Sequence, residues 1–111
     1  MYILVNKSLG MSSGKMSAQC CHSAINVYNL SKPEIKKKWD EGSFTKVILG
    51  GKNEKELEKF IKLANSLGLN IFAVHDEGRT EIKAGSMTVV GLEIIDKDEH
   101  GKKFRGFSLL G

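Results

Sequence analysis

The chain has 111 residues, of which 41% are hydrophobic and 27% charged, and this composition is ordinary for one globular domain of common size. No apolar run approaches the roughly 20 residues needed to cross a bilayer, and the first residues lack the basic and apolar regions of a signal peptide. The net charge of +4 is compatible with a polyanionic partner but does not require one. We therefore expect a single domain over residues 1–111, in the cytoplasm and without a membrane partner.

The first predicted strand and the first predicted helix frame a loop that contains two glycines. Residues 2–5 are a short, β-prone apolar run that we expect to be buried on both faces of a sheet. Residues 6–14 form the loop, in which Ser12 or Ser13 could cap the helical pattern that opens at Lys15. The first amides of a helix have no internal partner, and the helix dipole adds partial positive charge there. This place therefore suits an anion, or an oxygen that becomes negative during a reaction.

The rest of the chain alternates between helical and strand-like patterns. Capping-box patterns, with serine or asparagine followed three residues later by glutamate, predict two further helices. Apolar β-prone runs predict three further strands, and a charged loop leads to an apolar tail that could pair at a sheet edge or cover the core. The predicted helices open at Ser31 and Asn53, the strands cover 45–49, 70–74 and 87–95, and the loop and tail cover 96–103 and 104–110.

The order of these elements indicates an α/β fold. Strands separated by helices favour parallel pairing with right-handed crossovers. The strand at 87–95 follows a loop instead of a helix, so we expect it to be antiparallel to its neighbour. The prediction is a three-layer α/β/α sandwich around a mixed four-stranded sheet, with the last strand antiparallel. Because sites in such sheets form beyond the carboxyl ends of the parallel strands, residues 6–15 and 75–80 should meet at one edge.

Three side chains near that edge are candidates for chemistry. Lys15 could stabilise an oxyanion, or could be a solvated lysine at a helix start. Asp76 follows an apolar strand, where its carboxylate could hold or deprotonate a water, or could form a turn before Gly78. His22 lies two turns after Lys15 on the same helical face, so it could act as a general acid or a ligand, or could only pack.

Familiar motifs for nucleotide, serine and thiol chemistry are missing. The segment from Gly10 to Lys15 has three residues between its glycines, whereas a Walker A loop has four and a Ser or Thr after the lysine. No G-x-S-x-G elbow is present. Cys20 and Cys21 are adjacent, point in different directions on a helix and lack zinc-site spacing, so we interpret them as packing thiols of a reducing cytoplasm.

Hydroxyl and basic side chains could contact a substrate. Thr80 and Thr88 could bind a substrate carbonyl or hold Asp76, although a threonine on a strand is equally a β-branched filler. Basic residues could meet phosphates, although a run of charges is more often a solvated face. These basic residues are Lys36, Lys37, Lys38, Arg79, Lys83, Lys102, Lys103 and Arg105.

Two segments of the chain resemble one known family. GKMSAQCCHSA, residues 14–24, is similar to the G-K-x-A-A-Q-x-x-H-A segment of the type-two peptidyl-tRNA hydrolases, the archaeal and eukaryotic class. HDEGRTEIKAGSMTVVG, residues 75–91, resembles that family's D-A-G-R-T-Q-I-x-x-G-T-x-T-V segment. The resemblance covers nearly the whole chain and implies a mixed four-stranded α/β/α fold, often seen as a homodimer.

The resemblance also implies an activity, which is hydrolysis of the ester that joins a peptide to the 3′-terminal ribose of tRNA. It places the family's lysine, histidine and aspartate on Lys15, His22 and Asp76, and its two threonines on Thr80 and Thr88. In the expected mechanism Asp76 orients or deprotonates a water and Lys15 stabilises the oxyanion. The threonines hold the water or the peptide, and His22 tunes Lys15 or contacts the terminal adenosine. Neither a metal nor a cofactor is required.

Other residues of the matched segments add expectations and departures. Glu77 and Glu81 replace an alanine and a glutamine of the family and bring negative charge close to a site that should meet RNA. Two alternatives therefore remain, a catalytically silent RNA- or protein-binding domain on the same fold and an adaptor that docks a protein through residues 104–110. The residues expected to bind substrate are Gln19, Arg79 and Ser86, of which Ser86 stands where the family has a threonine.

Overall fold

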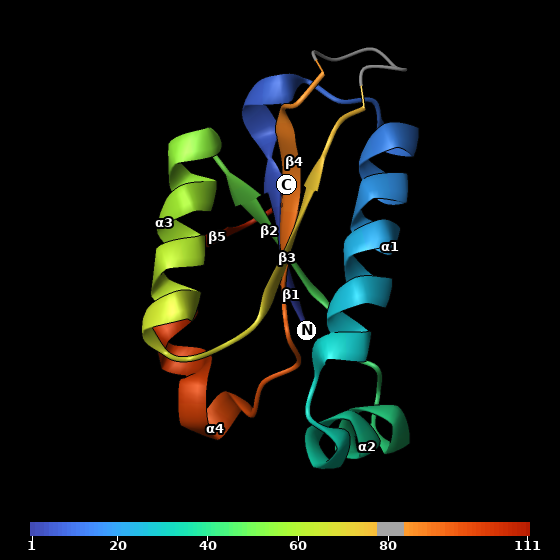
Figure 1. The fold of residues 1–111 in the computed structure, drawn as a ribbon, viewed down its shortest axis with the longest axis vertical. Coiled ribbons are helices and arrows are strands. Elements are labelled where there is room, and N and C mark those ends of the chain that lie inside the picture. Colours follow the sequence, from blue (N-terminus) through green and yellow to red (C-terminus); the bar gives the residue numbers. More distant parts are fainter. Residues whose placement is uncertain (78–83) are drawn as a thin grey trace.

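The computed structural model describes residues 1–77 and 84–111 (Figure 1). Within these residues the strands form one five-stranded sheet. Its strands are β1 (Tyr2–Asn6), β2 (Val47–Gly51), β3 (Ile71–His75), β4 (Met87–Leu92) and β5 (Ser108–Leu109), in the spatial order β3-β4-β1-β2-β5. β1 and β2 pair in parallel, whereas β4 runs antiparallel to both of its neighbours, β1 and β3. The predicted antiparallel strand is therefore confirmed.

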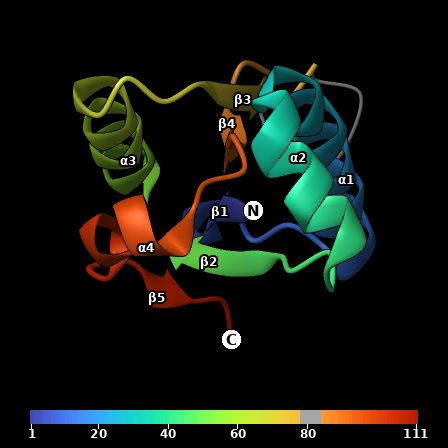
Figure 2. The same ribbon diagram turned by 90° about the horizontal axis from the view of Figure 1, so that it is seen from below.

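Helices lie on both faces of the sheet (Figures 1 and 2). One face is covered by α1 (Ser13–Leu30) and α2 (Pro33–Glu41), and the other by α3 (Glu54–Ser66) and the short α4 (Lys97–His100). Two short 3-10 helices, η1 (Lys7–Leu9) and η2 (Gly101–Phe104), complete the described elements. None of the described helices is both long and apolar enough to cross a bilayer.

The predicted mixed α/β class is confirmed, but the prediction of four strands was wrong by one. The fifth strand, β5, lies in the apolar tail, where Ser108 and Leu109 pair antiparallel with Gly50 and Leu49 of β2. The tail also covers the core, because Phe104 is only 3% exposed. The loop predicted over 96–103 contains α4 and most of η2, and the side chain of Asp96 caps α4 by accepting a hydrogen bond from the amide of Asp98.

Two of the predicted helix ends are confirmed by their capping contacts. The hydroxyl of Ser12 accepts a hydrogen bond from the amide of Lys15 at 3.2 Å, so α1 begins slightly earlier than its helical pattern suggested. The side chain of Asn53 accepts from the amide of Glu56 at the start of α3. Gly68 follows α3 with a φ of +70°, a conformation that glycine adopts without steric cost.

Ser31, by contrast, does not cap α2 as predicted. It is the C-cap residue of α1, and the cap position of α2 is occupied by Lys32, which makes no side-chain capping bond. The Ser31 hydroxyl donates to the carbonyl of Val27 at 2.7 Å and accepts from the amide of Ile94 at 2.8 Å. The Ser31 side chain therefore binds the distant amide of Ile94 instead of capping α2, as the local capping-box pattern had predicted.

α1 approaches the sheet closely at Gly91 of β4. A Cβ atom at this glycine would lie 2.3 Å from Oγ of Ser23 and 3.0 Å from Cγ1 of Val27, both on α1. The Ser23 hydroxyl also donates to the carbonyl of Phe72 on β3 at 3.2 Å. These contacts fix the helix directly over β3 and β4, and so determine where its amino-terminal side chains lie.

Candidate active site

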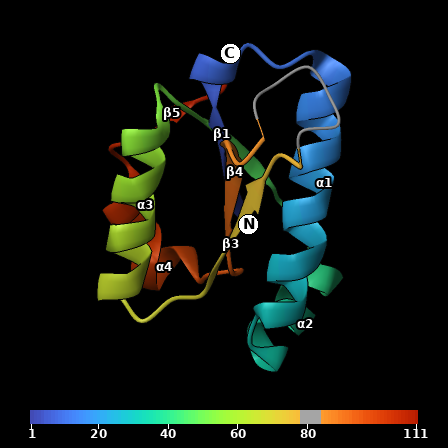
Figure 3. The same ribbon diagram turned by 45° about the horizontal axis from the view of Figure 1, so that its top comes forward.

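Three segments distant in sequence meet at one end of the sheet. The amino-terminal end of α1 lies beside the carboxyl end of β3 and the start of β4, and Figure 3 turns this end toward the reader. Apolar side chains anchor each segment below the site, among them Val27 on α1, Val74 on β3 and Val89 on β4, all in one hydrophobic cluster. This is the edge at which the sequence predicted the glycine-containing loop and Asp76 to meet.

Lys15 and Asp76 form an ion pair at this edge. The Nζ atom of Lys15 lies 2.7 Å from Oδ1 of Asp76, and the two side chains are 16% and 1% exposed. A carboxylate this deeply buried is costly unless a partner compensates its charge. The backbone of Asp76 is held as well, because its amide donates to the carbonyl of Ser86 at 2.9 Å and its carbonyl accepts from the amide of Gly85 at 2.7 Å. The backbone that carries Asp76 is therefore held in place by hydrogen bonds to residues 85 and 86.

Gln19 and Thr88 form a second link between α1 and the sheet. The Nε2 atom of Gln19 donates to Oγ1 of Thr88 at 3.0 Å, and that hydroxyl donates in turn to the carbonyl of Val74 at 3.0 Å. Thr88 is fully buried. Because its proton is directed to Val74, the hydroxyl offers a further partner only a lone pair. In this structure Thr88 holds Gln19 one helical turn from Lys15.

His22 lies apart from the ion pair. Seven residues at a rise of about 1.5 Å each put it about 10 Å along the helix from Lys15. Its ring is tilted against that of Phe72 on β3, with the ring centroids 5.9 Å apart, and the residue is exposed. The prediction that His22 and Lys15 share a helical face agrees with this placement. A contact with a bound substrate is therefore easier for His22 than a direct effect on Lys15.

The remaining predicted residues divide into two groups. Ser86 is half-buried, and its carbonyl holds the amide of Asp76, so its backbone belongs to the site. Arg79 and Thr80, together with Glu81, lie outside the described residues. The structure thus brings together Lys15 and Gln19 with Asp76, Ser86 and Thr88 from the second matched segment.

Asn6 is a structural member of the site that the sequence analysis did not single out. It ends β1 and is 2% exposed. Its Nδ2 atom donates to the carbonyl of Met87 at 3.0 Å, and its Oδ1 accepts from both the amide and the hydroxyl of Ser8. Asn6 therefore ties the end of β1 to the start of β4 beside the ion pair. The pattern that pointed to Asp76, a polar residue at the end of a buried strand, could also have pointed to Asn6.

The arrangement can support attack by water on a carbonyl group. It supplies a carboxylate that can bind or deprotonate a water, and beside it an ammonium and the amides of a helix start, which favour negative charge. Among the described residues no three His, Cys, Asp or Glu side chains gather as a metal site would require. Fold and site together define a mixed α/β domain in which a partly exposed lysine pairs with a buried aspartate at one end of the sheet.

Comparison with known sequences places the domain in a family. The family described as peptidyl-tRNA hydrolase PTH2 matches residues 1–110. The chain is 38% identical over 95 residues to the probable peptidyl-tRNA hydrolase 2 of Schizosaccharomyces pombe, which covers 83% of this chain and 46% of the relative. It is 33% identical over 111 residues to the peptidyl-tRNA hydrolase of Methanococcus vannielii, and this match covers 97% of the chain and 96% of the relative. The chain therefore belongs to the PTH2 family of peptidyl-tRNA hydrolases, and the resemblance of its two motifs is confirmed.

The relatives differ in length. The mitochondrial peptidyl-tRNA hydrolase 2 of Mus musculus is 34% identical over 105 residues, and the match covers 87% of this chain but 58% of the mouse protein. The chain thus spans about half the length of these yeast and mouse relatives and nearly all of the archaeal one. Because the mouse relative is named as mitochondrial, the cytoplasmic location stays a prediction.

Proposed function

We propose that this domain hydrolyses the ester between a peptide, or an N-blocked amino acid, and the 3′-terminal ribose of tRNA, and so releases free tRNA. The observation that carries the proposal is the 2.7 Å contact between Lys15 Nζ and Asp76 Oδ1. Membership of a peptidyl-tRNA hydrolase family supports the choice of substrate. The substrate is the RNA partner of the proposal, and neither a metal nor a cofactor enters the chemistry.

Asp76 and Lys15 have complementary roles in the proposed reaction. A carboxylate has about four lone-pair positions, so Asp76 can accept from Lys15 and still orient a water. The water oxygen attacks the ester carbonyl carbon while its proton passes to Asp76. An ammonium has three donors, so Lys15 can hold Asp76 and also donate to the oxyanion that forms. When the tetrahedral intermediate collapses, its bond to the ribose oxygen breaks and that oxygen takes up the proton.

The other residues of the matched segments bind and orient the substrate in this proposal. Thr80 and Thr88 help to hold the water or the peptide backbone, Thr88 through the amide of Gln19 that it anchors. His22, exposed beside Phe72, contacts the terminal adenosine. The side chains proposed to contact substrate directly are Gln19, Arg79 and Ser86. A homodimer, which the family resemblance implied, is part of the proposal but not of the mechanism.

The test is turnover of a peptidyl-tRNA preparation in the presence of EDTA. We expect release of peptide and intact tRNA at a rate that rises with protein concentration and is insensitive to the chelator. Binding of tRNA without any release would contradict the proposal and would favour the silent RNA-binding alternative. Turnover that EDTA abolishes and added divalent metal restores would contradict the metal-free mechanism.

A further inference from the structure

Three aromatic rings form a cluster at the end of α1 opposite the candidate active site. The rings of Tyr28 and Trp39 lie with their centroids 5.8 Å apart. Trp39 and Phe44 are 5.3 Å apart and perpendicular. Phe44, in the connection between α2 and β2, is 49% exposed, which is unusual for a large aromatic side chain. The cluster therefore presents a ring surface to solvent.

Two lysines lie directly against these rings. Nζ of Lys36 is 4.8 Å from the ring centroid of Tyr28, and Nζ of Lys46 is 4.9 Å from that of Trp39 and 5.9 Å from that of Phe44. Lys46 also donates to the carbonyl of Phe44 at 2.7 Å. Since an ammonium has three donors, this bond leaves Lys46 capacity for a phosphate oxygen. One exposed ring, Phe44, thus lies beside two half-buried rings and two lysines, and aromatic rings with nearby cations are the combination that binds single-stranded nucleic acid.

The backbone at Phe44 is strained. Its φ is +52°, in the left-handed region that asparagine or glycine adopts at lower cost. Such backbone strain is typical of functional positions, where the rest of the structure offsets its energetic cost. Here the strained residue carries the most exposed ring of the cluster.

A hollow beside the rings has the size and the walls for a single flat base. It has a volume of about 240 Å³, below the roughly 300 Å³ at which pockets for whole small molecules begin. Its walls include Ala24, Ile25, Tyr28 and Trp39, with Lys46 at the rim, and no carboxylate lines it. The hollow is thus apolar with one positive charge, as a base with its phosphate would require.

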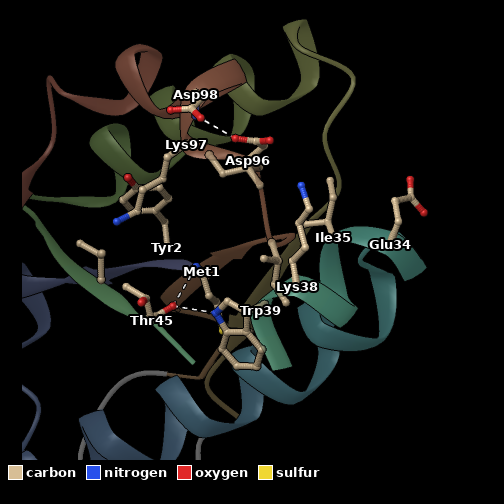
Figure 4. Close-up of a pocket in the computed structure, with 13 residues that line it drawn as sticks. Met1, Tyr2, Glu34, Ile35, Lys38, Trp39, Thr45, Asp96, Lys97 and Asp98 are labelled. Atoms are coloured by element: carbon tan, nitrogen blue, oxygen red, sulfur yellow. Dashed lines mark hydrogen bonds between the residues drawn. The ribbon is translucent and has the colours of Figure 1, made fainter. Parts of the chain in front are cut away.

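A larger cavity nearby lacks this character. Figure 4 shows it between α2 and α4, with a volume of about 360 Å³. Glu34, Asp96 and Asp98 line it together with Lys38 and Lys97. The aromatic cluster has one carboxylate beside it, Asp40, whose Oδ2 accepts from the Tyr28 hydroxyl at 2.8 Å. Because three carboxylates line the larger cavity, it would repel phosphates more strongly than the cluster does.

We propose that the cluster of Tyr28, Trp39 and Phe44, with Lys36 and Lys46, binds an unpaired nucleotide of the tRNA whose 3′ end occupies the active site. The inference rests on the proposed function, which supplies the RNA. Along α1 the cluster lies about 20 Å from Lys15 at a rise of about 1.5 Å per residue. That distance corresponds to about six stacked nucleotides at about 3.4 Å each. About six nucleotides are more than the few unpaired ones at a tRNA 3′ end, so the strand that joins the site to the cluster would be extended and not stacked.

Trp39 makes the inference directly measurable, because it is the single tryptophan of the sequence. We expect its fluorescence to be quenched as deacylated tRNA is added. The variants are Phe44→Asn, which removes the ring but suits the left-handed backbone, and Lys46→Gln. The matched control is Lys62→Gln, the same charge change at an exposed position of α3 on the other face. Phe44→Asn and Lys46→Gln should weaken the Kd for tRNA by about fivefold or more, and Lys62→Gln by less than about twofold.

Salt dependence and kinetics separate stacking from charge. The slope of log Kd against log salt concentration should fall by about one for Lys46→Gln and stay unchanged for Phe44→Asn. With peptidyl-tRNA, kcat/KM should fall in both variants, whereas hydrolysis of a short peptidyl-adenosine should match wild type. Uniform Kd values across all variants, with wild-type hydrolysis intact, would overturn this inference alone.

A second copy of the chain is the alternative occupant of the cluster. Sedimentation analysis of wild type and Phe44→Asn distinguishes the two. A dimer that Phe44→Asn dissociates while its Kd for tRNA stays at the wild-type value would overturn the RNA contact. Failure of the wild-type protein to hydrolyse peptidyl-tRNA would contradict the proposed function. The Kd values of the variants for tRNA would still show whether the cluster binds RNA.

Discussion

Nζ of Lys15 lies 2.7 Å from Oδ1 of Asp76, and this contact joins the start of α1 to the end of β3 across the edge of the sheet. The two residues come from the two sequence segments that resemble the family. Gln19 and Thr88 repeat the link one helical turn further along α1. The candidate active site is therefore a junction between one helix and two strands, and substitutions at that junction should affect stability and activity together.

Thr88→Val should destabilise the domain although it preserves the side-chain shape. The change leaves the amide of Gln19 without its acceptor and the carbonyl of Val74 without its donor, in a fully buried position. Loss of buried hydrogen-bond partners costs about 1–3 kcal/mol of unfolding free energy, which urea denaturation would measure. Hydrolysis should slow as well, because Gln19 loses its anchor.

Thr88→Ser provides the control for that prediction, since it keeps the hydroxyl and removes only a methyl group. It should recover most of the activity that Thr88→Val loses. Equal unfolding free energies for Thr88→Val and wild type would show that the hydroxyl does not contribute to this junction.

Gly91→Ala should separate α1 from β4. The added Cβ would lie 2.3 Å from Oγ of Ser23 and 3.0 Å from Cγ1 of Val27, so these side chains or the helix that carries them must shift. Overpacking of this kind costs about 1–3 kcal/mol, measurable as a lower midpoint of thermal unfolding. Gly106→Ala is the control, because a Cβ there meets nothing within 4 Å. Combining Gly91→Ala with Ser23→Ala should recover part of the loss, and a double variant no more stable than Gly91→Ala would refute this explanation.

The two cysteines should differ in reactivity. Burial, together with the neighbouring Cys21, raises the pKa of the Cys20 thiol above its ordinary value, whereas Cys21 is exposed. A raised pKa lowers the thiolate fraction at pH 8, and the thiolate is the reactive form. Titration with a thiol reagent at pH 8 should therefore show one fast and one slow cysteine, and Cys21→Ser should remove the fast phase. A fast phase that persists in Cys21→Ser would contradict this assignment.

Much of the fold followed from local patterns, and the misses have physical reasons. The rule that sites form at the carboxyl ends of parallel strands brought Asp76 to Lys15 correctly, because buried strands carry a strong apolar signal. β5 was expected only as one of two possibilities for the tail and α4 was not predicted, because two and four residues are too few to show a period. Ser31 was misassigned because its partner, the amide of Ile94, is 63 residues away in the sequence.

Side-chain roles were harder to predict than positions. The hydroxyl of Thr88 donates to the carbonyl of Val74 and accepts from Gln19, and neither of these contacts was predicted from the sequence. Asn6 holds β4 through the carbonyl of Met87, a contact that no sequence pattern encodes because it depends on strand order. Sequence motifs thus indicated the residues of the candidate site, and the hydrogen-bond network shows which of these side chains contact one another.

The central claim is that Lys15 and Asp76 act together on the ester, and single-turnover hydrolysis of peptidyl-tRNA by Lys15→Ala, Asp76→Asn and the double variant tests it most directly. Thermal unfolding of each variant serves as the folding control, because removing one partner of a buried pair also destabilises. We predict that each single change lowers the rate by about 10²–10³, or about 3–4 kcal/mol, and that the double variant is little slower because the pair acts as a unit. Rates at the wild-type level in well-folded single variants would contradict the account.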